Sequence, residues 1–581
     1  MESYIDIRTI IKKYSPNFGS SLPAFILNLV FTLLSKIIKE EKLNQYLRKC
    51  NNKTGIDFID EVFDLLNFTF NVSQKDRDKI PSQGPLLIVS NHPFGGIDGL
   101  MLIKLIYDVR SDVKIIVNNV LMEIPNLDEF FLPFNIFSNK FQKENVERIF
   151  ESIKQEEAII IFPAGEVSRL SFNGIRDGRW SKGVIYFASK YNTPILPVHI
   201  KGRNSLFFYF VSLINKKIST LLLPSQLLNK KNKNIEIKIG DIVPTPNLIS
   251  TIKDSKLQLK LLKKHVYNLG NGKKEILNTE KSIIKAIDRK ILKLQLREAP
   301  LLGITNDGKK IFILTYNGFP DVIREVARLR EVTFRGVGEG TGNRLDMDIY
   351  DRLYQHVVLW DEENLEVVGA YRIGVCEELL LKHGTEGLYT STLFNFSDNF
   401  KKKLPFALEL GRSFVQRKYW NSYSLDYLWQ GIGAFLYNHP EIKYLFGGVS
   451  LSGSYNTEAK ELLVYFYTKW FKGPEDIVTA KNRYTINQNK LETLEATFPG
   501  VDYKSELKIL KQSLKMFGFS IPTLFKQYSE LCSDNGCAFL DFGIDFDFNS
   551  CIDGFIFIEV DKIKPHKRER YIRNTDFLKV G

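Results

Sequence analysis

A histidine and an aspartate lie close together in a glycine-rich stretch, residues 90–100, which reads Ser-Asn-His-Pro-Phe-Gly-Gly-Ile-Asp-Gly-Leu. A neutral imidazole can take a proton from a hydroxyl group if a carboxylate fixes its tautomer and stabilises the imidazolium ion that forms. Asp98 is the only acid within reach of His92 in the sequence. The pair therefore predicts His92 as a general base and Asp98 as its orienting partner. The alternative is a loop histidine followed by an aspartate that caps a helix.

The residues around this stretch indicate a strand, a loop and a helix. An apolar run at 86–89 precedes the stretch, and an apolar segment with helical periodicity, 100–105, follows it. Ligands of α/β sheets bind beyond the carboxyl ends of strands, where His92 would lie. Further strand-like runs alternate with helical patterns and lie at 113–117, 159–162, 195–200 and 235–243. This alternation predicts an α/β domain.

Two more blocks follow the histidine stretch. Residues 158–169 read Ala-Ile-Ile-Ile-Phe-Pro-Ala-Gly-Glu-Val-Ser-Arg, and residues 194–200 read Pro-Ile-Leu-Pro-Val-His-Ile. In this order and spacing, the three blocks resemble those of the glycerolipid acyltransferase family. Asp98 follows His92 by six residues rather than the usual five, and Val167 stands where the family has an arginine. The resemblance therefore implies acyl transfer to an anionic acceptor other than glycerol 3-phosphate.

The same blocks contain candidate substrate-binding groups. Backbone amides near the glycines could stabilise an oxyanion, and a guanidinium group could bind a carboxylate or phosphate with two parallel hydrogen bonds. The alternative for the arginines is a basic loop in solvent. The candidates in this domain are Asn91, Gly95, Gly165, Glu166, Arg169, Arg176 and Arg179.

The second half of the chain carries its own motifs. They are a helix with Arg330 and Phe334, the acids at 348–351, a strand that ends in Arg372, and the block Glu-Leu-Gly-Arg at 409–412. They resemble the acyl-homoserine-lactone synthases and, more closely, the ornithine lipid N-acyltransferases, which share a GNAT-like fold. The resemblance extends over about 300–560 and implies transfer of an acyl group from a phosphopantetheine thioester to an α-amine.

That resemblance also implies roles for the charged residues. Glu409 is the candidate base, acting directly or through water, and Arg372 and Arg412 are candidates to bind the amino acid's carboxylate or the carrier's phosphate. Arg330 and Asp348 complete the predicted substrate-binding set. The alternative is a buried structural pair of arginine and glutamate.

The predicted fold class is thus α/β with two domains. We expect an N-terminal helical segment at 1–50, a glycerolipid-acyltransferase-like O-acyltransferase domain at 51–250, a helical connector at 251–299 and a GNAT-like N-acyltransferase domain at 300–581. The segment 21–38 is apolar but interrupted by polar residues, so an interfacial helix and a helix packed on its own domain both remain open.

Joined in one chain, the two domains predict a bifunctional acyltransferase of aminolipid synthesis. The C-terminal domain would N-acylate an amino acid, ornithine or another, with a 3-hydroxyacyl group, and the N-terminal domain would O-acylate the resulting lyso-aminolipid. The alternatives are a phospholipid acyltransferase with a regulatory GNAT-like domain, an N-acyl lactone synthase, and a basic membrane-surface adaptor without activity.

Composition indicates the partners. The chain has 80 Lys and Arg against 67 Asp and Glu, a formal charge of +13, which suits an acidic acyl carrier protein and an anionic membrane surface. Acyl carrier protein or coenzyme A would deliver the acyl group as a co-substrate, and no bound cofactor is expected. The 5 cysteines form no CxxC pair, so neither a metal site nor a disulfide framework is indicated. Without a secretory signal or an aromatic and basic platform, we expect a peripheral protein on the cytoplasmic side of the bacterial inner membrane and no nucleic acid partner.

Overall fold

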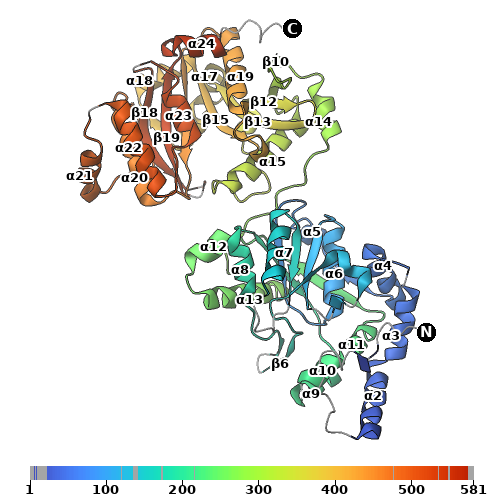
Figure 1. Cartoon of the computed structure of the whole chain (residues 1–581). Helices are drawn as coiled ribbons and strands as arrows, with labels where there is room; N and C mark the ends of the chain where they lie inside the picture. The colour runs from blue at the N-terminus through green and yellow to red at the C-terminus, as the bar shows by residue number, and fades with distance from the viewer. Residues whose placement is uncertain are drawn as a thin grey trace. The chain divides into compact units, whose positions relative to one another are not determined.

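The chain divides into two compact units, Met1–Ile284 and Lys285–Gly581 (Figure 1). The computed structural model describes residues 6, 8–9, 23–50, 52–118, 121–122, 124–134, 142–171, 174–214, 216–475, 477–500, 502–533, 535–546, 548 and 550–572. Part of the sequence predicted as a connector, 251–299, is helical, and its helices belong to different units. Helix α13 (Ser255–Gly270) contributes Leu262 to the core of the first unit, and α14 (Arg289–Leu296) contributes Leu292 to the core of the second.

The N-terminal unit is built on a seven-stranded sheet. Most neighbouring strands run parallel, and β9 runs antiparallel to β8. In spatial order the strands are β1 (Thr69–Asn71), β9 (Asn234–Ile239), β8 (Ile195–Ile200), β2 (Leu86–Ser90), β5 (Ala158–Ile161), β3 (Val113–Val117) and β4 (Phe131–Pro133). The central strands β2 and β5 are buried along their whole length, as expected for strands covered on both faces.

Helices cover both faces of this sheet (Figure 1). Because successive side chains of a strand point to opposite faces, β2 contributes to two cores. Leu86 and Ile88 pack with α4 (Gly55–Leu66) and α6 (Gly96–Tyr107). Leu87 and Val89 pack on the other face, where the helices are α7 (Lys143–Lys154), α8 (Gly183–Lys190) and α13. The loops after β2 and β5 thereby emerge side by side at one edge of the sheet.

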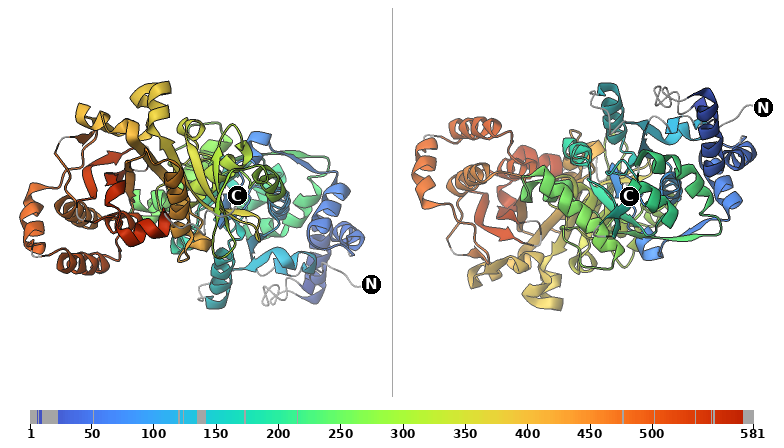
Figure 2. Two further views of the ribbon diagram at one scale, coloured as in Figure 1. Left: turned by 90° about the horizontal axis from the view of Figure 1, so that it is seen from above. Right: turned by 90° about the horizontal axis from the view of Figure 1, so that it is seen from below.

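The C-terminal unit contains an eight-stranded sheet with mainly antiparallel pairs. Its strands in spatial order are β10 (Leu301–Ile304), β11 (Lys310–Thr315), β12 (Gln355–Asp361), β13 (Glu366–Val375), β15 (Ala407–Val415), β16 (Tyr444–Leu451), β19 (Cys551–Glu559) and β18 (Cys537–Asp545). Helices α14 and α15 (Pro320–Gly336) pack on one face. The other face is covered by α19 (Ser424–Asn438), α20 (Thr457–Trp470), α22 (Tyr503–Met516) and α23 (Thr523–Ser529). Several of these helices lie on the outer side of strands β18 and β19 (Figure 2).

One strand pair in this sheet departs from the rest. Strands β15 and β16 are parallel and pair at Ala407–Glu409 with Tyr444–Phe446. Beyond these positions, the described residues of the two strands form no further pairs, although both strands continue. The two strands therefore separate and leave backbone groups on their facing edges open to a ligand.

The strands predicted at 113–117 and 195–200 coincide with β3 and β8. The strand predicted at 235–243 ends earlier, at Ile239. In the described ranges, every helix is too short or too polar to cross a lipid bilayer.

Candidate active sites

His92 and Asp98 lie together between strand β2 and the first turn of helix α6. The Nδ1 atom of His92 is 2.9 Å from Oδ2 of Asp98, whose side chain is fully buried. The same carboxylate oxygen accepts hydrogen bonds from the backbone N–H groups of Phe94 (2.8 Å) and Gly95 (3.0 Å). Asp98 therefore fixes the start of the helix and the orientation of the imidazole at once. With Nδ1 facing the carboxylate, Nε2 is the nitrogen that can take a proton.

A second buried carboxylate, Asp177, connects the histidine loop to the loop after β5. Its Oδ1 atom accepts hydrogen bonds from the backbone N–H of His92 (3.2 Å) and the hydroxyl of Ser168 (2.5 Å), and its Oδ2 atom accepts one from Trp180 Nε1 (2.9 Å). The His92 ring stacks on Phe162 with the centroids 4.1 Å apart. The role of Asp177 was missed from the sequence, where it is one charge among several in a basic loop.

Asn91 and the two predicted glycines shape these loops. The Asn91 side chain donates to the carbonyl of Ile200 (2.9 Å) and accepts from its N–H (2.8 Å), which ties β2 to β8. Gly95 and Gly165 have φ angles of 107° and 64°, which favour glycine. Their N–H groups bind Asp98 and the carbonyl of Phe162, respectively. These two amides are therefore engaged within the folded chain, and oxyanion binding by backbone amides near them stays a prediction.

Arg169 and Glu166 pair with each other instead of facing a substrate. The Nε atom of Arg169 donates to Oε2 of Glu166 at 3.0 Å. Its Nη1 atom donates to the hydroxyls of Ser212 and Ser219, both at 2.6 Å. These bonds hold the segment after β8 in place, and the anion-binding role of Arg169 stays a prediction.

The other two predicted arginines of this unit remain exposed. The guanidinium carbon of Arg176 lies 5.2 Å from the ring centroid of Tyr267, and Arg179 is exposed near it in the sequence. Both follow Ser168 in the sequence, and the Ser168 N–H donates to the carbonyl of His92. The two arginines therefore lie on the chain segment next to the histidine loop. They remain candidates to bind an anionic group.

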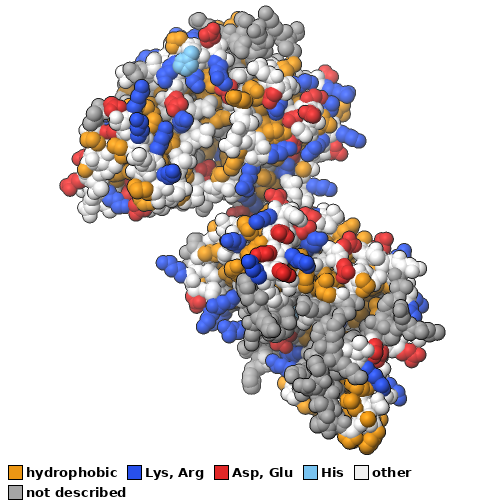
Figure 3. Space-filling model, viewed as in Figure 1, with side chains coloured by type: hydrophobic (Ala, Val, Ile, Leu, Met, Phe, Trp, Pro, Cys, Tyr) orange, Lys and Arg blue, Asp and Glu red, His pale blue; other side chains and the backbone are white. Residues whose placement is uncertain are grey.

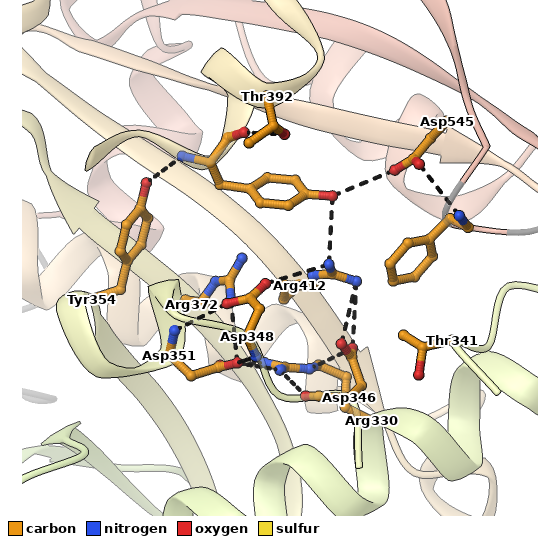
Figure 4. A network of polar contacts seen from close by, with 12 residues as sticks. Arg330, Thr341, Asp346, Asp348, Asp351, Tyr354, Arg372, Thr392, Arg412 and Asp545 are labelled. Carbon is orange, nitrogen blue, oxygen red and sulfur yellow. Dashed lines mark hydrogen bonds and ion pairs between the residues drawn. The ribbon is translucent and has the colours of Figure 1, made fainter. Parts of the chain in front are cut away.

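The C-terminal unit brings together arginines and acids from distant parts of the sequence (Figure 4). Arg330, fully buried on α15, pairs with Asp346 (2.7 Å) and with Asp351 (2.9 Å). Arg372, on β13, pairs with Asp348 (2.6 Å) and more distantly with Asp351 (3.4 Å). The adjacent guanidinium groups hold the pKa of the Asp351 carboxyl far below its usual range, although burial opposes them.

Arg412 joins the same network from β15. Its guanidinium lies 3.4 Å from Asp346 and 3.5 Å from Asp348, and it also contacts the Tyr389 hydroxyl at 3.5 Å. Its φ angle of 49° is unusual for a residue with a side chain and occurs where the pairing of β13 with β15 is irregular. Such strain is typical of residues held in place for function.

Two guanidinium nitrogens in this network still lack partners. Within the described part of the chain, Nε of Arg412 and Nη2 of Arg372 are buried and donate to no hydrogen-bond partner. Unpaired buried donors of a cation are costly, so the site is suited to an anionic ligand such as a carboxylate.

Glu409 lies behind these arginines and is almost completely buried. One of its carboxylate oxygens accepts a hydrogen bond from the Thr390 N–H (2.7 Å), and the other accepts one from the Tyr354 hydroxyl. Burial raises the pKa of Glu409. Because both oxygens are engaged, the geometry suits a residue that positions Tyr354, whose ring lies 5.4 Å from the guanidinium carbon of Arg372.

Comparisons with known proteins agree with the division of the chain into two domains. A family model described as Acyltransferase matches residues 9–275, and one described as Acetyltransferase (GNAT) domain matches 329–430. A Glycine N(alpha)-acyltransferase of Phocaeicola vulgatus is 34% identical over 305 residues, which cover 50% of this chain and 93% of that protein. A Lyso-glycine lipid O-acyltransferase of Bacteroides thetaiotaomicron is 29% identical over 249 residues, which cover 41% of this chain and 88% of that protein.

Among solved structures, a CoA-dependent acyl-homoserine lactone synthase matches with a TM-score of 0.19 and 15% identity, covering 34% of this chain and 92% of that one. A TM-score this low carries no argument. The family matches confirm both domain resemblances inferred from the motifs, the fold class and the prediction of an acyltransferase. The chain therefore belongs to the family of aminolipid acyltransferases to which the glycine N(alpha)-acyltransferase belongs, and it joins an N-terminal acyltransferase domain to a C-terminal GNAT domain.

Proposed function

We propose that this chain makes a glycine lipid by two successive acylations. The GNAT domain joins a 3-hydroxyacyl group to the α-amine of glycine, and the N-terminal domain then acylates the 3-hydroxyl. One observation carries this proposal: a single chain matches nearly the full length, 93% and 88%, of two proteins named for these two steps. Glycine takes the place of ornithine as the proposed acceptor. The phospholipid alternative is not favoured, because both relatives are named for acylation of glycine or a glycine lipid.

The geometry of the N-terminal site supports the second acylation. His92 Nε2 takes the proton of the 3-hydroxyl while Asp98 stabilises the imidazolium through Nδ1. The hydroxyl oxygen attacks the thioester carbonyl, the new C–O bond forms and the C–S bond breaks. The proton on His92 then passes to the departing thiolate, so that the base is restored. Arg176 and Arg179 are proposed to bind the carboxylate of the lyso-lipid.

The C-terminal site supports the first acylation. The unpaired nitrogens of Arg372 and Arg412 are proposed to bind the carboxylate of glycine. The open edges of β15 and β16 would bind the amide groups of the phosphopantetheine arm through backbone hydrogen bonds. Acyl carrier protein is the proposed donor for both steps, because it is acidic and the chain has a formal charge of +13.

Exposed apolar helices of the N-terminal unit support peripheral binding to the inner membrane surface. Helix α2 (Ala24–Ile38) exposes Phe25, Leu29, Leu33 and Ile37, which recur every four residues and form one stripe. Helix α9 (Leu206–Ile214) exposes a second set, Leu206, Phe207, Phe210, Leu213 and Ile214. Hydrophobic side chains gather over α2 in Figure 3.

Lys36 and Lys216 are exposed beside these two apolar surfaces and suit anionic headgroups. A double substitution, Leu29→Asp with Phe210→Asp, should lower binding to vesicles containing anionic lipid by about tenfold or more. Leu257→Asp, at an exposed site on α13, is the matched control and should leave binding unchanged. Equal binding of all three proteins would refute the membrane-docking role.

Mass spectrometry of reactions with the purified full chain tests the proposed function. The chain is incubated with labelled glycine and a 3-hydroxyacyl thioester, and a second acyl thioester is added later. We expect N-(3-hydroxyacyl)glycine first and the diacylated product only after the second addition. The proposal would be contradicted if the chain transferred no acyl group from either thioester to glycine but acylated lysophosphatidic acid.

A further inference from the structure

Three carboxyl groups outside the arginine network lie near one another, beside the part of β16 that no longer pairs with β15. They are Asp553 on β19, Asp545 at the end of β18, and Glu339 in the loop after α15. Asp553 is only 5% exposed. It interacts electrostatically with both Glu339 and Asp545. None of the three belongs to the motifs that identified the domain.

Asp553 lies on β19, the neighbour of β16 on the side away from β15. It pairs in register with Ser450 across the two strands, and the Ser450 hydroxyl donates to its Oδ1 at 2.6 Å. Gly448 lies on the same face of β16, two residues before Ser450. A side chain at Gly448 would begin 4.0 Å from the carboxyl carbon of Asp553, so the glycine leaves space beside this carboxyl group.

A buried cation lies close enough to this carboxyl group to interact with it electrostatically. Arg412 on β15 interacts electrostatically with Asp553, and its side chain is 10% exposed. Its Nε atom and Nη2 of Arg372 are buried without partners among the described residues. Tyr389 connects the two sides, since its hydroxyl lies 3.5 Å from both Arg412 and Asp545. Unsatisfied cationic donors and a buried acid at one site suit a small zwitterion, such as an α-amino acid.

We propose that Asp553 binds the α-ammonium group of the amino acid acceptor and removes a proton from it, with Glu339 passing that proton to solvent. This inference rests on the proposed N-acylation. It assigns Asp553, rather than Glu409, as the base of this step. Arg372 and Arg412 would hold the carboxylate of the same molecule, so the two ends of the acceptor are bound by opposite charges.

The proton balance of the reaction requires such a group. An α-ammonium nitrogen carries three hydrogens and the amide product carries one, so two protons must leave. Asp553 takes the first, which frees the lone pair that attacks the thioester carbonyl. The C–N bond forms and the C–S bond breaks, and the second proton goes to the departing thiolate. Glu339 returns Asp553 to its ionised form by transferring the first proton to water.

The local electrostatics match this role. The pKa of Asp553 is raised to about 6, because the effects of burial and of the nearby Asp545 outweigh those of the Ser450 hydrogen bond and Arg412. Burial raises the pKa of Glu339 to about 7, with a smaller contribution from Asp553. Both carboxyls can therefore exchange protons near neutral pH. Among the residues that the structure describes, the titratable or charged groups that interact with Asp553 are Glu339, Tyr389, Arg412, Asp545 and Cys551.

Asp553→Asn in the full chain tests the proposal. We expect kcat/KM for glycine to fall by about a hundredfold or more, because amide nitrogen and oxygen cannot accept the proton. O-acylation of supplied N-(3-hydroxyacyl)glycine by the same protein should change less than about twofold. The matched control is Asp541→Asn, which removes a buried β18 carboxylate that binds Arg483 and the Ala480 N–H. This control should keep N-acylation within about threefold of the unsubstituted chain.

A second variant keeps the proposal falsifiable if Asp553→Asn does not fold. Ser450→Ala removes the hydrogen bond that lowers the pKa of Asp553. A base must be ionised, so kcat/KM for glycine falls as pH drops through that pKa, and Ser450→Ala should move this acid limb to higher pH. An unshifted limb in Ser450→Ala, or an unchanged kcat/KM in folded Asp553→Asn, would overturn the inference. Failure of the unsubstituted chain to acylate glycine would instead overturn the proposed function on which the inference rests.

Discussion

The two candidate active sites hold their chemical groups in different ways. In the N-terminal unit, one short loop carries both His92 and Asp98, and backbone N–H groups of the same loop bind the carboxylate. In the C-terminal unit, the charged groups come from a helix, several strands and the loops between them, and Arg330, Arg372 and Arg412 share three aspartates. The first site is local, whereas the second depends on the fold of the whole unit.

The difference follows from the two acceptors. A hydroxyl group is neutral and needs one well-oriented base, which a single loop can provide. A free amino acid carries two opposite charges and must lose protons before its nitrogen can attack. Binding it requires buried cations and acids together, and such groups are stable only when many partners satisfy them. We therefore expect substitution of His92 to change activity alone, and substitutions in the second site to change activity and stability together.

The largest effect should come from the loop site. His92→Ala should lower the rate of O-acylation by about a thousandfold, because the base is lost, and should leave N-acylation unchanged. Asp98→Asn should also lower O-acylation strongly, since the orientation of the imidazole is lost. Single-turnover assays with separate substrates measure both steps. Equal losses of N- and O-acylation in His92→Ala would contradict the independence of the two sites.

The network site should respond in its stability. Arg330→Ala leaves the buried carboxylates of Asp346 and Asp351 unpaired and should lower the free energy of unfolding by about 3–5 kcal/mol. Arg324→Ala, on an exposed position of the same helix, should change it by less than about 0.5 kcal/mol. Urea unfolding followed by tryptophan fluorescence is suitable, because Trp360, Trp420, Trp429 and Trp470 all belong to the C-terminal unit. Similar unfolding curves for both variants would show that the network does not stabilise the fold.

The smallest effect concerns pH. Burial lowers the pKa of His356, next to the arginine network, to about 4 from a usual value of 6.5. The folded state therefore binds fewer protons than the unfolded state between these values, and stability falls as pH drops from about 6.5 to about 4. This group contributes up to about 3 kcal/mol to that loss. His356→Gln should flatten the curve of unfolding free energy against pH, while His439→Gln, at a partly exposed site, should not. Parallel curves for all three proteins would contradict the assignment of a neutral buried His356.

The loop site could be predicted from the sequence because its parts are neighbours in the chain. His92 and Asp98 are six residues apart, and buried parallel strands such as β3 and β8 appear as apolar runs. Arg169 shows the limit of this reasoning. The sequence shows its charge but not the hydroxyls of Ser212 and Ser219 that surround it in the folded chain.

Much of the C-terminal site could be predicted only where a known motif covered it. Arg330, Asp348, Arg372 and Arg412 were identified in this way, and the structure brings them together. Asp553 is far from them in the sequence and lies in an apolar strand without a recognisable pattern. Only the spatial order β15, β16 and β19 brings it near Arg412, and strand order cannot be read from local periodicity.

The most direct test of the account is lipid mass spectrometry of a host without aminolipids that expresses the full chain or its His92→Ala variant. We predict a new diacylated glycine lipid from the full chain, whose head-group fragment is glycine. The His92→Ala variant should accumulate N-(3-hydroxyacyl)glycine in its place. An unchanged aminolipid profile together with altered phosphatidic acid would contradict the account and favour a phospholipid acyltransferase.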